Sequence, residues 1–206
     1  MSEDRDALER QIREAFESQS YERAATLTIE HYGPELLGFL LSQLHDSDAA
    51  SEVFAEFCAI FWETLPTFEW RCSIRTWAYK LARNAAARHR KRERLRGGAQ
   101  QLSRLSELSI AVERVRTATL GYRRTDVKDR FQELRASLPQ EEQELLILRV
   151  DRGLSWLELA EVLFDEGESA SESGLKTEAA RLRKRFQLVK DRLRTLVAQA
   201  GLLEDQ

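Results

Sequence analysis

Apolar residues recur at intervals of three and four along much of the first half of the chain, which is the period of an amphipathic helix. Residues 21–44 follow this pattern, and the Gly33-Pro34 pair inside them predicts a break or a kink. Residues 47–65 form a second predicted helix, and Pro66 ends it because proline disfavours helical geometry in the residue before it. The apolar stripe of this second helix contains Phe54, Cys58, Phe61 and Leu65.

The second half of the chain carries clear helix boundaries. Ser137 with Gln140, and Ser155 with Glu158, each match a capping box, in which two side chains satisfy backbone N–H groups at a helix start. Residues 151–153, Asp-Arg-Gly, form a predicted tight turn between those two helices. A last helix is predicted to begin near Leu175, and its apolar stripe alternates by four and three. The stripe comprises Leu175, Ala179, Leu182, Phe186, Val189, Leu193 and Leu196.

These periodicities predict an all-α fold with two small helical domains joined by a linker. Gly97-Gly98 breaks the helical pattern of the first half, and the composition then shifts towards Gln, Ser and Leu. Apolar residues still recur at helical spacing after this point, which predicts an ordered or semi-ordered connector. We place the first domain at residues 1–96, the linker at residues 97–125 and the second domain at residues 126–206.

The composition favours a soluble helical protein without a cofactor. The 206 residues are 42% hydrophobic and 33% charged, and three prolines with few aromatics favour helices over sheets. The longest apolar run, residues 36–41, is too short to cross a bilayer, and the acidic start MSEDRDALER is unlike a signal peptide. Cys58 and Cys72 stand apart, so neither a disulfide framework nor a structural zinc site is indicated. We therefore expect a cytoplasmic protein with no metal, no cofactor and no membrane partner.

Charge is strongly segregated along the chain although the net charge is only -3. Residues 46–69 hold six acids and no Lys or Arg, whereas residues 71–96 hold ten Lys or Arg and one acid. The contrast returns between residues 155–173, with six acids and no base, and residues 175–194, with eight bases and two acids. Alternating blocks of this kind indicate separate surfaces with separate partners.

The basic segment after Ser73, a plausible N-cap, has the features of a nucleic-acid-binding helix. Its cations are mostly arginine with almost no acid to pair with inside the segment, and Trp70 and Trp77 bracket a short loop beside it. Aromatic rings next to arginines hold unstacked bases, since every base offers a π face. A solvated charged helix, with Trp77 as an ordinary core residue, is the alternative. One face of the helix holds Trp77, Ala78, Leu81 and Ala85, and the neighbouring face holds Lys80, Arg83, Asn84, Arg88 and Lys91.

Three segments resemble the sigma-70 family, specifically its extracytoplasmic-function branch. SIRTWAYKLARNAAARHRKR resembles the promoter-melting segment of these factors, and ASEVFAEFCAIFWETLPTF resembles their polymerase-docking helix. LPQEEQELLILRVDRGLSWLELAEVL is similar to the start of their C-terminal helix-turn-helix domain. The three segments occur in family order, cover roughly half of the chain, and imply an all-α initiation factor with a region 2-like and a region 4-like domain.

The resemblance implies that residues 47–65 dock on the clamp coiled coil of the largest subunit of core RNA polymerase. The flap of the polymerase is a further implied partner of the chain. The implied polymerase-binding residues are Glu52, Val53, Glu56 and Phe57, and Ala55 replaces a Gln that is common in the family. The loop at residues 67–73 would capture a flipped base of the minus-ten element. The implied contacts to the minus-ten nontemplate strand are Arg71, Arg75, Trp77, Lys80, Asn84, Arg88 and Lys91.

The C-terminal domain would bind the minus-35 duplex with a recognition helix braced by residues 155–163. Its implied DNA contacts are Lys176, Thr177, Arg181, Lys184 and Arg185, each more often a phosphate contact than a base contact. Residues 164–174, FDEGESASESG, replace the short turn usual in the family and predict a mobile acidic surface loop. This insertion is either neutral, a shield for the basic helix, or a docking site for an inhibitor such as an anti-sigma factor.

Rival functions remain open at this stage. A helix-turn-helix repressor would use residues 155–194 but would leave the basic segment after Ser73 unexplained, and a polymerase-binding adaptor would dock without initiating. An enzyme is disfavoured because His31, His45 and His89 lie in unlike surroundings, and no nucleophile, metal-ligand or phosphate-loop pattern accompanies them.

Overall fold

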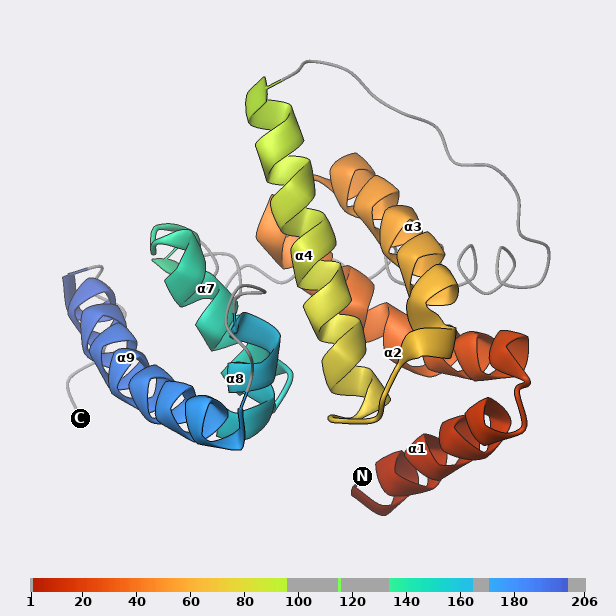
Figure 1. The fold of residues 1–206 in the computed structure, drawn as a ribbon. Helices are drawn as coiled ribbons and strands as arrows, with labels where there is room; N and C mark the ends of the chain where they lie inside the picture. Colours follow the sequence, from red (N-terminus) through yellow and green to blue (C-terminus); the bar gives the residue numbers. More distant parts are fainter. Residues whose placement is uncertain (1, 96–114, 116–133, 165–170, 200–206) are drawn as a thin grey trace. The chain divides into compact units, whose positions relative to one another are not determined.

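The computed structural model describes residues 2–95, 115, 134–164 and 171–199, and these residues form only helices and connecting turns. The prediction of an all-α fold is therefore confirmed. The chain divides into two compact units, Met1–Tyr122 and Arg123–Gln206, and Figure 1 shows the helices of each. None of the described helices is both long and apolar enough to cross a bilayer.

The first unit is a helical bundle built around one central helix. Its elements are α1 (Ser2–Glu17), α2 (Tyr21–Leu44), α3 (Ser47–Thr64), the short 3-10 turn η1 (Leu65–Thr67) and α4 (Ile74–Leu95). Helix α2 packs on α1, α3 and α4, and α3 packs on α4 as well (Figure 1). Helix α4 is therefore supported by α2 and α3.

Large apolar side chains fill the interior of this unit. Phe39 of α2 meets Tyr79 of α4 edge-to-face, with ring centroids 5.6 Å apart. A fully buried side chain of this kind contributes about 1.5–3 kcal/mol relative to an exposed one. The largest fully buried side chains include Phe39, Phe54, Phe57, Phe61, Tyr79, Ile12, Ile29, Leu36 and Leu37.

Helix α2 runs without a break through the Gly33-Pro34 pair, so the predicted interruption is absent. Proline removes one backbone hydrogen bond from a helix interior. Tyr32, Leu36 and Leu37 on either side of it are buried, and this packing holds the helix together across the gap.

One residue of the predicted linker, Val115, is described, and it packs on the first unit. It is 5% exposed, and a Cβ on Gly33 would lie 3.0 Å from its Cγ2 atom and 3.4 Å from Phe54. The absence of a side chain at Gly33 is therefore what admits Val115 to this position. The rest of residues 97–125 lies outside the described residues, as do the proposed domain limits there.

The predicted helix boundaries within the first unit hold with small shifts. Asp46 caps α3 by accepting hydrogen bonds from the backbone of Asp48 (2.8 Å) and Ala49 (3.1 Å). Pro66 lies in η1, directly after α3 ends. Ser73 accepts a hydrogen bond from the Thr76 backbone at 3.1 Å, which confirms it as a cap of α4.

The second unit contains α7 (Gln140–Leu146), the π-helical turn η2 (Ile147–Asp151), α8 (Trp156–Leu163) and α9 (Glu172–Gln199). Helix α9 packs on α7 and α8. Its apolar stripe is confirmed, because Ala179, Leu182 and Val189 are buried, and Phe186, Leu193 and Leu196 pack beside Val189, Leu138 and Leu146.

Two predictions for this unit need correction. The Ser155–Glu158 capping box is present, but Ser137 donates its hydroxyl to the Leu134 carbonyl in the preceding turn, so it caps nothing at Gln140. Helix α9 begins at Glu172 rather than near residue 175, so the last residues of the predicted acidic loop are helical. Residues 165–170 of that loop lie outside the described residues.

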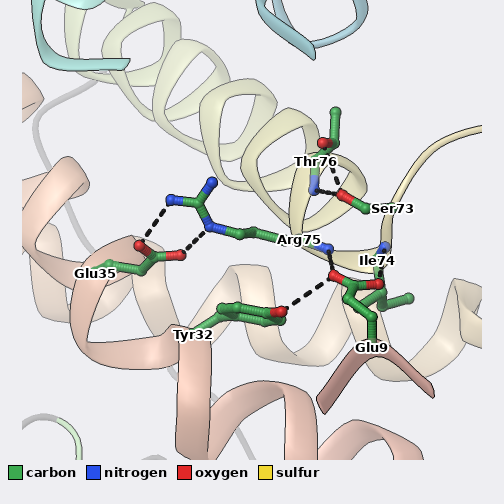
Figure 2. A network of polar contacts seen from close by, with 7 residues as sticks. All are labelled: Glu9, Tyr32, Glu35, Ser73, Ile74, Arg75 and Thr76. Carbon is green, nitrogen blue, oxygen red and sulfur yellow. Dashed lines mark hydrogen bonds and ion pairs between the residues drawn. The ribbon is translucent and has the colours of Figure 1, made fainter. Parts of the chain in front are cut away.

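The first turn of α4 is held by a polar network from α1 and α2 (Figure 2). Glu9 of α1 accepts hydrogen bonds from the backbone N–H groups of Ile74 (3.1 Å) and Arg75 (3.2 Å). The Tyr32 hydroxyl donates to the same carboxylate at 3.1 Å. A carboxylate at a helix N-terminus satisfies unpaired donors and opposes the positive end of the helix dipole. Burial and the neighbouring Glu9 charge raise the pKa of Tyr32, so its hydroxyl remains a donor.

The Arg75 side chain completes this network in the interior. Arg75 is 2% exposed, and its guanidinium donates to both carboxylate oxygens of Glu35 at 2.6 and 2.9 Å. Its guanidinium carbon also lies 5.2 Å from the centre of the Tyr79 ring. A bidentate pair of this geometry fixes both partners, so α2 and α4 are joined in one register.

Replacing Glu35 with Gln should destabilise the fold, because it removes the negative charge that compensates buried Arg75. We expect a loss of about 2–4 kcal/mol in the free energy of unfolding, measured by urea denaturation with circular dichroism. Glu63→Gln, the same change on an exposed position of α3, is the control and should stay within about 0.5 kcal/mol of wild type. Equal stabilities for the two variants would contradict the role of the pair.

Candidate nucleic-acid interface

Helix α4 has a buried face and an opposite polar face. The buried side consists of Arg75, Ala78, Tyr79, Ala82, Ala85, Ala86 and His89. At 100° per residue the predicted residues Trp77, Lys80, Asn84, Arg88 and Lys91 lie on the other side. Arg88 and Lys91 are exposed, and the other three are partly exposed. The structure thus brings five of the predicted minus-ten residues onto one strip, which we call the α4 strip.

Trp77 packs into an aromatic group at the start of the α4 strip. Its ring stacks on Phe68 with centroids 4.6 Å apart and an interplanar angle of 23°, and it lies 5.1 Å from Phe61 of α3. The ring is nevertheless partly exposed. Trp77 therefore serves as a packing residue and also leaves part of its surface open on the strip.

Arg71 and Arg75, two predicted DNA contacts near the start of α4, differ in their exposure to solvent. Arg75 is removed from the candidate DNA contacts, because its guanidinium is buried against Glu35 and cannot reach a phosphate at the surface. Arg71 lies on the loop before α4, where its side chain is 80% exposed and pairs with Glu69 at 2.5 Å. Such an exposed pair is weak, so Arg71 keeps the accessibility that a phosphate contact needs.

The acids that the basic segment lacks come from neighbouring helices. Glu56 of α3 pairs with Arg92 through both carboxylate oxygens and with Arg88 at 3.4 Å. Burial alone raises the pKa of Glu56, but the hydrogen bonds and charges of Arg92 and Arg88 outweigh burial and hold that pKa below its ordinary value. The hydrogen bond to Glu56 in turn raises the pKa of Arg92. This edge of the α4 strip is therefore partly neutralised from α3.

The predicted polymerase-binding residues of α3 separate into two groups. Val53 and Phe57 are 0% exposed and form part of the core, so they are corrected to structural residues. Glu52 and Glu56 are partly exposed. The two predicted contact residues that α3 offers to a partner are therefore both acids, and one of them, Glu56, is engaged by α4.

The loop before α4 carries Trp70, one of the two tryptophans predicted to bracket a base-binding loop, in a strained backbone conformation. Trp70 has a φ of 56°, and its indole nitrogen is buried without a hydrogen-bond acceptor among the described residues. Each feature costs about 1–3 kcal/mol. Phe16 lies edge-on at 5.5 Å, Phe68 lies at 5.0 Å, and the Arg13 guanidinium lies 5.2 Å from the ring centre. These contacts offset part of the cost, since aromatic pairs contribute about 0.5–1.5 kcal/mol each.

Helix α1, which supplies Glu9, Arg13 and Phe16, was missed by the sequence analysis. The apolar spacing of Leu8, Ile12 and Ala15 is a weak helix signal that could have located it. No sequence signal, however, indicates that Glu9 would reach the start of α4.

In the second unit the predicted minus-35 residues lie on the exposed side of α9. Thr177, Arg181 and Lys184 lie opposite the buried stripe and are exposed. The Thr177 hydroxyl donates to the Ser173 carbonyl at 3.0 Å, and Arg181 pairs with Glu178 at 3.0 Å. These interactions are local to the helix, so they leave the side chains on its outer face.

The two flanking candidates on α9 are paired with acids. Lys176 pairs with Glu172 at 2.6 Å on the first turns, and this hydrogen bond lowers the pKa of Glu172. Arg185 reaches Glu141 of α7 and is partly exposed. Lys184 has no such contact within the part of the chain that the structure describes, which makes it the most available cation of the group.

Trp156 at the start of α8 ties this helix to its neighbours. The Arg149 guanidinium lies 4.7 Å from its ring centre, and Phe186 of α9 lies edge-on at 5.5 Å. This cluster fixes the angle at which α8 supports α9. Across the described ranges of both units, no group of three or more His, Cys, Asp or Glu side chains could hold a metal ion.

Glu56→Gln should lower stability at neutral pH but not at low pH. Because the pKa of Glu56 is depressed in the folded state, its ionised carboxylate stabilises the fold above the unfolded pKa, and this contribution disappears as pH falls through the folded pKa. For a pair at the surface we expect about 0.5–1 kcal/mol at pH 7. Urea midpoints of wild type and variant, measured from neutral pH to about pH 3, should converge. A difference that is independent of pH would contradict this role.

Comparison with known protein families finds a match within the first unit. Residues 28–96, about a third of the chain, match the family model described as Sigma-70 region 2. This segment begins within α2 and includes α3, the loop and α4, which together carry the α4 strip. A search among curated proteins found no match. The region 2 match lies on a helical part of the chain, and it shows that residues 28–96 are similar to Sigma-70 region 2.

Proposed function

We propose that the chain is a bacterial transcription initiation factor of the extracytoplasmic-function branch, which binds core RNA polymerase and directs it to specific promoters. The observation that carries the proposal is the position of the α4 strip within the segment that matches Sigma-70 region 2. That match supports a sigma-factor role in transcription initiation, with core polymerase and promoter DNA as partners. The branch and the specific contacts are our inference from the sequence motifs.

The first unit would recognise and melt the minus-ten element. Lys80, Arg88 and Lys91 offer cations for phosphates, Asn84 offers an amide for a base edge, and Trp77 offers part of a π face. Cations position a nucleic acid and amides read it. The strip is therefore suited to a single strand whose bases are accessible.

The stacking energy of these contacts is too small to open the DNA duplex without a partner. Each base stacked on protein contributes about 1–3 kcal/mol, and each duplex step costs about 1.4 kcal/mol to open. A few captured bases cannot sustain a bubble unaided. We therefore assign melting to the complex with polymerase, which also performs the chemistry of RNA synthesis.

Helix α3 would supply part of the polymerase contact. Glu52 and Glu56 form its partly exposed acidic surface, while Val53 and Phe57 hold the helix in the bundle beneath. An acidic surface on a rigid helix suits docking on the clamp coiled coil if that partner presents basic groups. Contact with the flap would fall to the second unit.

The second unit would bind the minus-35 duplex through α9, with α8 as its support. Thr177, Arg181 and Lys184 are the outward residues for this role, and Lys176 and Arg185 flank them. A helix presented on a second helix is the arrangement that places side chains in a major groove. The cytoplasm, where polymerase and DNA meet, is the location that this function requires.

An adaptor that binds polymerase without initiating is the second candidate. Ala55 in place of the common Gln, and the engagement of Glu56 by Arg92, both weaken the implied docking surface. An initiation factor would support transcription from a promoter, whereas an adaptor would not.

Purified chain added to bacterial core polymerase should co-elute with it and produce transcripts with discrete start sites on a genomic promoter library. Sequencing the transcript 5′ ends gives the start sites, and core polymerase alone is the control. Co-elution without transcripts would favour the adaptor. Absence of co-elution together with tight duplex binding would favour a repressor.

Lys184→Gln should weaken binding to promoter duplex and reduce its salt dependence. If Lys184 contacts a phosphate, the slope of log K against log salt should fall by about 1, measured by fluorescence anisotropy on a promoter selected above. Arg194→Gln, further along α9 and paired with Asp191, removes the same charge and should leave the slope unchanged. Identical slopes for both variants would remove Lys184 from the interface.

A further inference from the structure

Gly33 lies in the middle of α2, where a glycine is unfavourable for the helix. Glycine disfavours a helix interior by roughly fivefold relative to alanine, and Pro34 directly follows it. Gly33 is nevertheless buried, and a Cβ on it would lie 3.0 and 3.2 Å from the two methyl carbons of Val115 and 3.4 Å from Cζ of Phe54. The glycine therefore has a packing role, because it leaves a notch in α2 that the Val115 side chain fills.

The occupant of this notch comes from the segment between the two predicted domains. Val115 is 5% exposed, and Phe54 of α3, on the other side of the notch, is 0% exposed. We call the surface formed by Gly33 and Phe54 the Gly33 notch. A residue of the predicted connector is thus seated between two helices of the first unit.

The Val115 contact is strong enough to hold and weak enough to open. Burial of one valine side chain favours the docked state by about 10- to 150-fold. Fixing the backbone of one residue reduces this preference by about 5- to 30-fold. On this one contact, the attachment of Val115 to the Gly33 notch is therefore reversible.

Docking of Val115 shortens the tether between the two units. Leu95 ends α4, and Leu134 is the first described residue of the second unit. A chain extends by at most about 3.3–3.6 Å per residue, so roughly 130 Å is the longest span between these two points. With Val115 held at Gly33, the tether runs only from residue 115 to residue 134 and spans at most roughly 65 Å. The attachment therefore halves the maximum reach.

We propose that Val115 and the Gly33 notch form a latch, which attaches the connector to the first unit and limits how far the second unit can separate from it. Glu52 and Glu56 lie two residues before and after Phe54, so at 100° per residue they are about 160° around α3 from it. The latch therefore leaves the acids proposed for polymerase uncovered. It sets the separation of two DNA elements that one chain can bind at once, and this consequence alone rests on the proposed function.

The competing explanation is that Val115 only completes the core of the first unit, with no effect on the second. Gly33→Ala separates the two explanations. The backbone of Gly33 is helical, so alanine suits α2, but its Cβ displaces Val115 because buried Phe54 cannot yield. Val115→Ala removes the same contact from the other side. Val150→Ala, the same change at a valine that is 54% exposed in the second unit, is the control.

The first measurement is the rate at which trypsin cleaves the full chain after Arg116, which follows Val115 in sequence. A protease cuts a docked segment only when it opens, so the rate follows the undocked fraction. Gly33→Ala and Val115→Ala should each raise this rate by about tenfold, and Val150→Ala should match wild type. Gly33→Ala is the stricter variant, because it leaves the sequence around the cleaved bond unchanged.

The double variant Gly33→Ala/Val115→Ala tests direct contact. The new Cβ at residue 33 takes the space that the lost valine methyl groups leave, so cleavage should be no faster than in Val115→Ala alone. Two independent losses would instead multiply to about a hundredfold.

The second measurement is the mean separation of the two units, obtained by small-angle X-ray scattering. A coil of about 39 residues has a root-mean-square span of about 34 Å, and one of about 19 residues spans about 24 Å. The separation should therefore rise by roughly 10 Å in Gly33→Ala and stay at the wild-type value in Val150→Ala.

Three outcomes would overturn the latch. Equal cleavage of wild type, Gly33→Ala and Val115→Ala would show that Val115 does not hold the connector. Multiplied rates in the double variant would show that residues 33 and 115 act separately. Faster cleavage without a change in separation would reduce Val115 to a core residue. Neither DNA nor polymerase is present in these measurements, so the latch and the proposed function can fail independently.

Discussion

The position of the candidate nucleic-acid helix depends on the polar anchor at its first turn. Arg75 is buried and bidentate with Glu35, and Glu9 accepts the backbone donors of the same turn (Figure 2). Buried charges of this kind contribute little net stability when paired but are costly to unpair, so they select one arrangement over its neighbours. The orientation of the α4 strip is fixed because α1, α2 and α4 meet at the Arg75 guanidinium and at the carboxylates of Glu9 and Glu35.

The charge blocks that are separate in the sequence are partly paired with one another in the fold. Residues 71–96 appear to be a nearly unopposed cationic block, but acids from earlier helices reach into it. Glu35 neutralises Arg75 at the buried end, and Glu56 engages two arginines nearer the other end. Lys80, Asn84 and Lys91 lie between these contacts on the outward face. The fold thus places one cation of this basic helix in the interior and directs others outward.

Periodicity in the sequence was sufficient to predict α2, α3, α4 and α9, because each buries a continuous stripe that repeats every three or four residues. Periodicity did not predict the burial of residues at the edge of a stripe. Val53 and Phe57 lie one position from the predicted stripe, and the core of the bundle is wide enough to bury them as well. Arg75 was misjudged for a different reason, since its partner Glu35 is forty residues away in sequence.

In the candidate site, too, helix periodicity predicted some features and tertiary contacts determined others. The 100° turn of α4 was sufficient to group Lys80, Asn84, Arg88 and Lys91 on one face, whereas Trp77 was predicted on the neighbouring apolar face. The left-handed backbone of Trp70 and the capping of α4 by Glu9 depend on tertiary contacts, and no local pattern encodes them. Of the two capping boxes, only Ser155–Glu158 formed, because the helix near Ser137 starts later, at Gln140.

The pairing of Glu56 with Arg88 and Arg92 links the α3 surface that we propose for polymerase to the α4 helix that we propose for DNA. A phosphate and the Glu56 carboxylate are alternative ligands for the same guanidiniums, so a polyanion that recruits these arginines must first displace an internal competitor. Conversely, a basic surface that engages Glu56 from the α3 side releases two positive charges on α4 without touching that helix. Binding at the α3 surface therefore changes the charge on α4, and binding at α4 changes the charge at Glu56. Neither effect requires the backbone to move.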